Sequence, residues 1–180
     1  MSQKVLAALL LITGAVLVGV VFSNKIGDRD SDSEASTEQG TFSSTYAGEN
    51  HSLAWECLDD HSGLASHIHT YLNISIEGVQ MLIPSDTGIA TEVCDGMHLI
   101  HSHDSSGKLH VETPEIEEVP LGVLFQIWDI YFAEEGIADR RIDDDHELVM
   151  TVDGIVVDSY ENHILVNGQQ IVIELRESGI

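Results

Sequence analysis

The sequence predicts an α+β fold, a small mixed β-sheet domain with one packed helix, preceded by an N-terminal transmembrane helix or signal peptide. Three observations support this prediction. Apolar and polar residues alternate from residue 67 to 77, apolar residues recur at helical spacing from 120 to 132, and an unbroken apolar run fills residues 5–22. Alternation is typical of a half-buried strand, and three- and four-residue steps are typical of a helix that faces a core.

The apolar run follows a short polar N-terminal cap, residues 1–4, which carries Lys4 and the amino terminus. As a helix the run would span about 27 Å, close to the thickness of the bilayer hydrocarbon. A basic cap before an apolar run is also typical of a secretory signal peptide. Residues 5–22 are therefore a transmembrane anchor or a signal peptide. We expect a single-pass protein of the cell membrane with its domain on the extracytoplasmic side, or a secreted protein if the segment is cleaved.

Residues 23–50 are predicted to form a flexible acidic linker. This stretch is rich in Asp, Ser, Glu, Thr and Gly and has few apolar side chains. Such a segment buries too little apolar surface to offset the conformational entropy lost on ordering. Residues 51–180 remain, and they are numerous enough for one β-rich extracytoplasmic domain with a single core.

The charge of the chain is strongly negative. It carries 31 acidic and 7 basic side chains, a formal net charge of −24. Nucleic acid is excluded as a partner, because phosphate binding requires Lys and Arg side chains. A saline environment would screen the self-repulsion of so many carboxylates. The expected partner is the membrane, through the N-terminal segment, and a protein partner in the cell envelope is left unidentified.

The strands of the domain can be followed along the sequence. The first begins at His67, and Glu77-Gly78 is a turn into a second strand, 79–83, which completes a hairpin. Two shorter strands, 97–103 and 108–112, flank a turn-rich tetrad. After the helix, strands are predicted at 148–152, 155–157 and 171–175, with turns at Asp153-Gly154 and Asn167-Gly168.

The one helix predicted in the domain begins at Pro120, because proline suits the first helical position. Its apolar stripe includes Leu121, Leu124, Phe125 and Trp128 and extends toward Phe132. A helix across one face of a mixed sheet buries the apolar sides of both, which a β-grasp-like domain achieves with few elements. A β-sandwich with one decorating helix is the alternative.

Two cysteines, Cys57 and Cys94, are present. Outside the cytoplasm an even pair is most simply one disulfide. The alternative is that Cys94 is a soft metal ligand beside the histidines.

Histidines are the residues that point most clearly to chemistry. The chain has ten, and five of them lie in the short patterns His67-Ile-His69, His101-Ser-His103-Asp104 and His110-Val-Glu112. On a strand, residues i and i+2 point to the same side, about 6–7 Å apart. Two His-x-His pairs on neighbouring strands therefore offer four nitrogens, a set that suits copper or zinc. We predict His67, His69, His101, His103, His110 and Glu112 as metal-ligand candidates and Asp104 as a carboxylate that orients an imidazole.

Other interpretations stay open. A His-x-His pair on a polar strand is often only solvated or hydrogen-bonded, so the domain could be a structural or interaction module of the cell envelope without metal. A metal-dependent hydrolase is a further alternative, with Glu112 as the base. No glycine-flanked serine elbow or phosphate-binding glycine loop is present, so an enzyme is not the expected class. Histidines 51, 61, 98, 146 and 163 are expected to be ordinary surface or loop residues, with His98 a reserve candidate.

The segment from His101 to Pro114 resembles an uncharacterised family of archaeal and bacterial secreted or membrane-anchored proteins. Members of that family carry a His-Thr-His-Asp-x-Ser-Gly-x-x-His-x-Glu-Ser-Pro signature. The upstream His-x-His pair, the element Ile83-Pro84…Gly88-Ile89, the cysteine before the signature and the helix pattern Leu121-Gly122-x-x-Phe125-x-x-Trp128 are similar too. Here Ser102 and Thr113 replace the usual Thr and Ser. The resemblance implies a domain and a set of residues rather than an activity.

Together these patterns predict a membrane-anchored extracytoplasmic domain that binds a transition metal, copper or zinc, through a histidine cluster. Metal binding, delivery or sensing at the cell surface is the expected role.

Overall fold

The computed structural model describes residues 40–179. The predicted anchor or signal segment and most of the predicted linker lie outside these residues. Within residues 40–179, no helix has the length and apolar character needed to cross a membrane. Phe42 and Tyr46, near the start of the described part, pack against the core of the domain.

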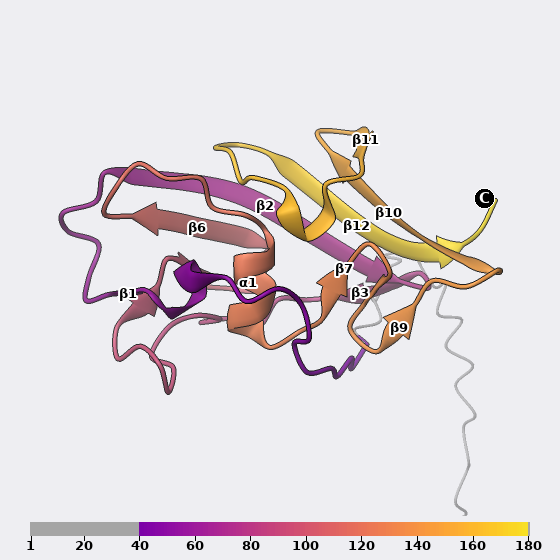
Figure 1. The fold of residues 1–180 in the computed structure, drawn as a ribbon, viewed down its shortest axis with the longest axis horizontal. Helices are drawn as coiled ribbons and strands as arrows, with labels where there is room; N and C mark the ends of the chain where they lie inside the picture. Colours follow the sequence, from indigo (N-terminus) through magenta and orange to yellow (C-terminus); the bar gives the residue numbers. More distant parts are fainter. Residues whose placement is uncertain (1–39, 180) are drawn as a thin grey trace, which may run out of the picture. The chain divides into compact units, whose positions relative to one another are not determined.

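A mixed sheet of seven strands dominates the fold, as predicted (Figure 1). Its strands lie in the order β11-β10-β12-β2-β6-β5, and β3 pairs with the second half of β2. The strands are β2 (Ser66–Ile76), β3 (Val79–Met81), β5 (Ile100–His101), β6 (Lys108–Thr113), β10 (His146–Val152), β11 (Ile155–Val157) and β12 (Gln170–Glu177). All neighbouring pairs are antiparallel except β12 and β2.

Strand β2 is the central and longest element of the sheet. Its first half pairs with β6, its second half with β3, and its other edge with β12. The apolar side chains of its alternating pattern, among them Leu72, Ile74 and Ile76, are buried. This burial explains why the period-two pattern predicted the strand to within one residue at each end, since a shift of register by one residue would expose that whole apolar face.

Both predicted two-residue hairpin turns are present. Glu77 and Gly78 between β2 and β3 have positive φ angles of 53° and 79°, and Asp153 and Gly154 between β10 and β11 have 52° and 80°. Two consecutive positive φ angles are typical of the type I′ turn, whose twist matches that of antiparallel strands.

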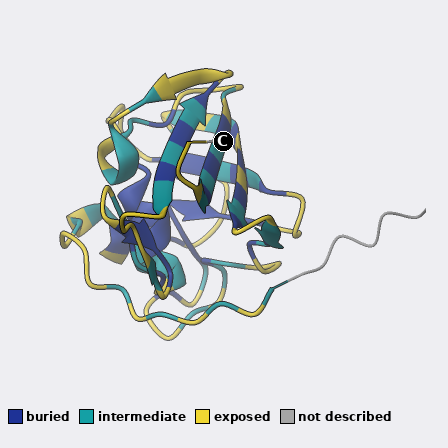
Figure 2. Ribbon diagram, turned by 90° about the vertical axis from the view of Figure 1, so that its right-hand side faces the viewer, coloured by how far each residue is buried: buried dark blue, intermediate teal, exposed yellow. Residues whose placement is uncertain are grey.

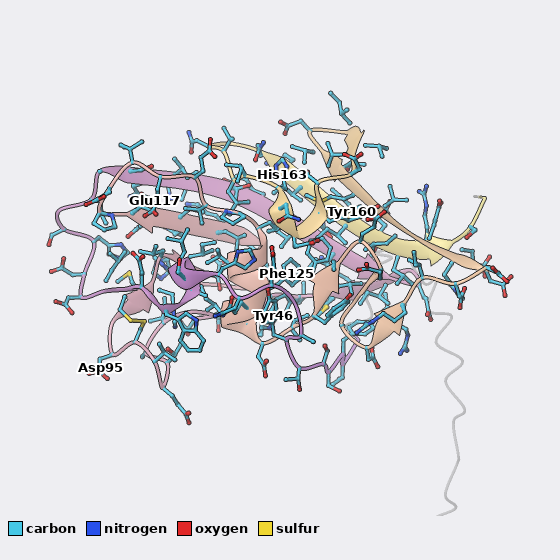
Figure 3. The ribbon with its side chains drawn as sticks, in the orientation of Figure 1. Tyr46, Asp95, Glu117, Phe125, Tyr160 and His163 are labelled. Carbon is cyan, nitrogen blue, oxygen red and sulfur yellow. A yellow bond between two sulfur atoms is a disulfide. The ribbon has the colours of Figure 1, made fainter. Side chains whose placement is uncertain are left out.

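The helix α1 (Gly122–Trp128) is shorter than its apolar stripe predicted. It ends because Asp129 adopts a left-handed conformation, with φ 58° and ψ 37°. Phe132 consequently lies on a strand, where its ring stacks on that of Phe125 with centroids 4.4 Å apart. Phe125 itself is fully buried in the middle of the molecule (Figure 3), and the dark-blue interior in Figure 2 is the core that the helix and the sheet share.

Two small sheets were not predicted. One pairs β1 (Cys57–Leu58) with β4 (Met97–His98), and the other contains β7 (Phe132–Ala133), β8 (Gly136–Ile137) and β9 (Arg140–Arg141). Two short 3-10 helices, Ser52–Trp55 and Tyr160–Asn162, complete the elements of the described part. The strand predicted at 97–103 was wrong in extent, because its residues divide between β4, which pairs with β1, and β5, which pairs with β6. The other strands of the small sheets have two residues each, which is too short to show alternation.

Candidate metal centre

Three neighbouring strands carry four of the five predicted histidines on one face of the sheet, and His103 lies just beyond the end of β5. The register pairs His69 with His110 between β2 and β6, and His110 with His101 between β6 and β5. Two residues further along the same pair of strands, and on the same face, His67 pairs with Glu112. Residues in direct register on neighbouring strands have side chains within reach of one another. The sheet itself therefore assembles the cluster, since it brings β2 beside β6 and places His67 near His110, 43 positions away in the sequence.

Glu112 lies at the centre of the cluster and is fully buried. His61 Nδ1 lies 2.7 Å from its Oε2 and 2.9 Å from its Oε1. His67 Nε2 lies 3.1 Å and His110 Nδ1 3.8 Å from the same Oε1. A buried carboxylate requires hydrogen-bond donors or cations around it, and here imidazoles supply all of these close contacts.

His101 is fully buried and has one ring nitrogen without a partner. Its Nδ1 donates to the His98 carbonyl oxygen at 3.1 Å. That bond places the proton on Nδ1, so Nε2 carries a lone pair, and this buried atom has no hydrogen-bond partner among the described residues. A histidine held by a carbonyl at one nitrogen, with the other free, has the arrangement typical of a metal ligand.

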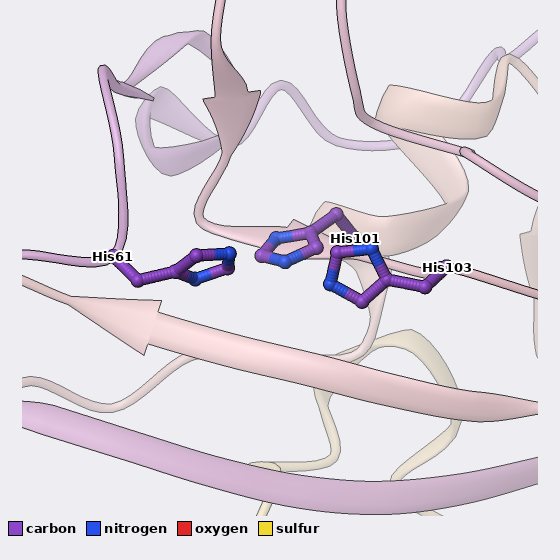
Figure 4. A group of neighbouring side chains, drawn as sticks. All are labelled: His61, His101 and His103. Atoms are coloured by element: carbon purple, nitrogen blue, oxygen red, sulfur yellow. The ribbon is translucent and has the colours of Figure 1, made fainter.

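The possible ligand atoms form three groups, each with all of its atoms within 4.8 Å of one another. We call His61, His101 and His103 the His61 trio, and His67, His69 and His110 the His67 trio. The third group, His101, His110 and Glu112, takes a member from each trio and adds the carboxylate. Figure 4 shows the three rings of the His61 trio turned toward one another. The cluster is thus geometrically able to hold a metal ion.

The buried side of the cluster keeps its imidazoles neutral. Desolvation by burial is the largest cause that lowers the pKa of His110 to about 4, and the positive charges that His69 and His101 would carry lower it further. Burial also lowers the pKa of His69 and of His101. Neutral imidazoles have a free lone pair at neutral pH, which metal coordination requires.

One side of the cluster is open to solvent. The side chains of His61 and His67 are 48% and 41% exposed, whereas that of His110 is 16% exposed. An ion could reach the site from this side without unfolding of the domain.

All six predicted ligand candidates lie in the cluster. The five histidines among them divide between the two trios, so that His67 and His69 group with His110, while His101 and His103 group with His61; Glu112 belongs to the third group. Asp104 is exposed, and its carboxylate accepts the N–H of Ser106 at 2.8 Å, which shapes the turn before β6. Its predicted action on an imidazole stays a prediction.

His61 was expected to be an ordinary surface or loop residue; it is an exposed loop residue, but it also contacts Glu112 and belongs to the cluster. It lies in a loop without periodic pattern before β2, and only the folded chain brings it to Glu112. The acidic context Asp59-Asp60-His61 gave no signal that separates a ligand from a solvated loop. His98 was expected to be a surface or loop residue and a reserve candidate for the site; it is 3% exposed and supports His101 through its carbonyl oxygen.

A disulfide joins Cys57 to Cys94, with their Cα atoms 5.5 Å apart. Because the sulfur of Cys94 is bonded to that of Cys57, it cannot be a thiolate, and the alternative of Cys94 as a metal ligand is wrong. Cys57 is in register with His98 between β1 and β4, and the Cys94 sulfur lies 3.5 Å from His98 Nδ1. The disulfide therefore braces the residue whose carbonyl oxygen orients His101.

The loop that contains Gly88 supports the cluster from beneath. Its backbone accepts hydrogen bonds from residues just before and just after β5. The His98 N–H donates to the Gly88 carbonyl oxygen, and the Ser102 N–H donates to the Thr87 carbonyl oxygen. Gly88 has φ +80°, and a Cβ atom there would lie 2.6 Å from the Ile100 carbonyl oxygen and 3.3 Å from His101 Cβ.

We expect Gly88→Ala to destabilise the domain by about 2–4 kcal/mol, because strain from the left-handed conformation adds to a backbone clash. Gly154→Ala is the matched control. It has the same φ of +80° but nothing within 4 Å of its Cβ, so about 1 kcal/mol is expected. Urea unfolding of both variants measures the difference, and equal losses would show that the packing beneath His101 is loose.

The chain matches no protein-family model, no curated protein and no solved structure.

Proposed function

We propose that the protein is a membrane-anchored extracytoplasmic domain that binds copper or zinc through its histidine cluster, for metal binding, delivery or sensing. The observation that carries the proposal is the buried, unpartnered Nε2 of His101, beside a fully buried Glu112. Leaving a buried polar atom unsatisfied costs about 1–3 kcal/mol, and a metal ion would satisfy it.

The donor set favours a transition metal over calcium or magnesium. Six imidazoles and one carboxylate surround the site, and imidazole suits zinc and copper, whereas hard cations prefer oxygen ligands. The low pKa of His110, about 4, also removes proton competition at that nitrogen near neutral pH.

The location and the finer fold are part of the proposal. The apolar run 5–22 and the disulfide both suit a chain that acts outside the cytoplasm. The resemblance to secreted or membrane-anchored proteins points the same way. A β-grasp-like topology is supported by the strand path β3-β2-β12-β10-β11. Of these five strands, β2 comes first in the sequence and β12 comes last, and the two lie parallel to each other as neighbours in the sheet.

Metal content by elemental mass spectrometry tests the proposal. The full chain is purified in mild detergent without a histidine tag and washed with a weak chelator in high salt, which strips ions held only by acidic surface groups. We expect copper or zinc to remain bound stoichiometrically. The His67→Ala/His101→Ala variant removes one ligand from each trio and should lose this metal.

The control is His146→Ala/His163→Ala, which removes two histidines outside the cluster and should retain the wild-type metal content. A folded, metal-free wild-type protein that also fails to take up added zinc or copper would contradict the proposal that the cluster binds metal.

That outcome would favour a second candidate, an interaction module of the cell envelope. One observation supports it. The edge strand β11 presents Ile155 and Val156, which are 70% and 69% exposed. An exposed apolar edge strand is a site where another chain can add a strand.

A further inference from the structure

The cluster contains more ligands than one ion requires. Zinc sites in proteins are almost always four-coordinate when structural. The six imidazoles and the Glu112 carboxylate provide more donors than this. The imidazoles form two trios with no shared member, and Glu112 groups with one histidine of each. A single ion in either trio would leave three imidazoles of the other trio unused.

Glu112 lies between the two trios and contacts both. Its Oε1 is 3.1 Å from His67 Nε2 and 3.8 Å from His110 Nδ1, both in the His67 trio. Its Oε2 is 2.7 Å from His61 Nδ1, in the His61 trio, and Oε1 lies 2.9 Å from the same atom. Glu112 thus contacts a member of each trio, and it also groups with His101 and His110, one from each trio. A carboxylate has two oxygens, so one side chain in this position could bind an ion on either side.

The spacing of the donors suits tetrahedral coordination. With metal–nitrogen distances near 2.0–2.1 Å, neighbouring ligand atoms of a tetrahedral zinc site lie about 3.3 Å apart. His67 Nε2 lies 3.4 Å from His110 Nδ1 and 3.1 Å from Glu112 Oε1. Two donor pairs around His67 thus already have this spacing, and the third, His110 Nδ1 to Glu112 Oε1, is longer at 3.8 Å. In the His61 trio the donor atoms lie within 4.8 Å of one another, which ring rotations can close.

Two divalent ions repel each other, and the surroundings reduce this repulsion. The bridging carboxylate would place a negative charge between them, and the chain carries a net charge of −24. Half-exposed His61 and His67 also leave the site in contact with water, whose dielectric screens the ions.

We infer that the cluster is a dinuclear centre, in which the His61 trio and the His67 trio each bind one transition-metal ion and Glu112 bridges the two through its separate oxygens. The inference rests on the proposed function and specifies its stoichiometry.

Zinc titration of the metal-free full chain in detergent, followed by calorimetry and elemental analysis, tests the stoichiometry. We expect two ions per wild-type chain. His61→Ala/His103→Ala and His67→Ala/His69→Ala should each retain one, and the His146→Ala control should retain two. One ion in the wild type overturns the dinuclear centre while the proposed function stands, whereas none overturns both.

Loading with Cu(II) tests the bridge by electron paramagnetic resonance. Two ions joined by a carboxylate should be magnetically coupled and give a half-field transition, which each double variant should lack. Glu112→Gln, checked for folding by circular dichroism, should give two uncoupled copper spectra. A wild-type spectrum of two isolated Cu(II) ions, with no half-field signal, would overturn the bridge even if Glu112→Gln failed to fold.

Discussion

The metal-free domain should lose stability as the pH falls from about 6.5 to about 4. Burial lowers the pKa of His110 to about 4 in the folded state, while an unfolded histidine titrates near 6.5. In that window the unfolded chain binds more protons than the folded one, so protons favour unfolding. His110 alone should contribute a loss of about 3 kcal/mol, and the lowered pKa values of His69, His98 and His101 act in the same direction.

Urea unfolding with a chelator present, at pH 7.0 and pH 4.5, measures this loss. Acid also neutralises carboxylates and relieves self-repulsion in a chain of charge −24, which works in the opposite direction. The comparison with His110→Gln separates the two effects, because both proteins share the repulsion. The variant should lose less stability than the wild type by about 2–3 kcal/mol. Parallel losses in both proteins would mean that His110 is not desolvated as described.

Removing the disulfide should produce an effect of similar size. The bond closes a loop with a sequence separation of 37, for which the chain-entropy model gives about 4 kcal/mol. In a domain of this size that loss would lower the melting temperature by about 10 °C. Cys57→Ser/Cys94→Ser, compared with wild type by thermal circular dichroism in the presence of chelator, measures it.

The same variant should also bind metal more weakly. Cys57 and Cys94 flank His98, and the His98 carbonyl oxygen fixes the tautomer and orientation of His101. Loss of such a supporting contact typically costs about 10–100-fold in metal affinity. Unchanged zinc affinity in a folded Cys57→Ser/Cys94→Ser protein would show that the β1–β4 pair holds His98 without the bond.

The large sheet could be predicted from the sequence because its strands bury one face. β2, β10 and β12 each alternate between buried and more exposed residues, and this pattern appears directly in the sequence. The order of the strands could not be predicted in the same way, since pairing depends on contacts distant along the chain. The helix was overestimated because Phe132 continues its apolar spacing, although Asp129 ends the helix through a backbone conformation that the stripe does not encode.

The candidate site was predictable to the extent that strands position it. His67, His69, His101 and His110 lie on strands, so their shared face follows from spacing and register. The place of His61 depends on the path of a loop, which no periodicity describes. The central position of Glu112, between two sets of imidazoles rather than at their margin, likewise follows only from the folded geometry.

The parallel pairing of β2 with β12 has a consequence for the order of events during biogenesis. Thr70, on the central strand, donates a hydrogen bond to the carbonyl of Gln169, 99 residues further along the chain. Contacts of such large sequence separation slow folding, because a long loop must close before they form. The nascent chain therefore cannot complete its sheet until its C-terminal strand has been synthesised, and Asn167, which accepts the backbone N–H of His69, arrives equally late. On the proposed function, an ion would therefore meet the completed sheet only after this strand has been synthesised.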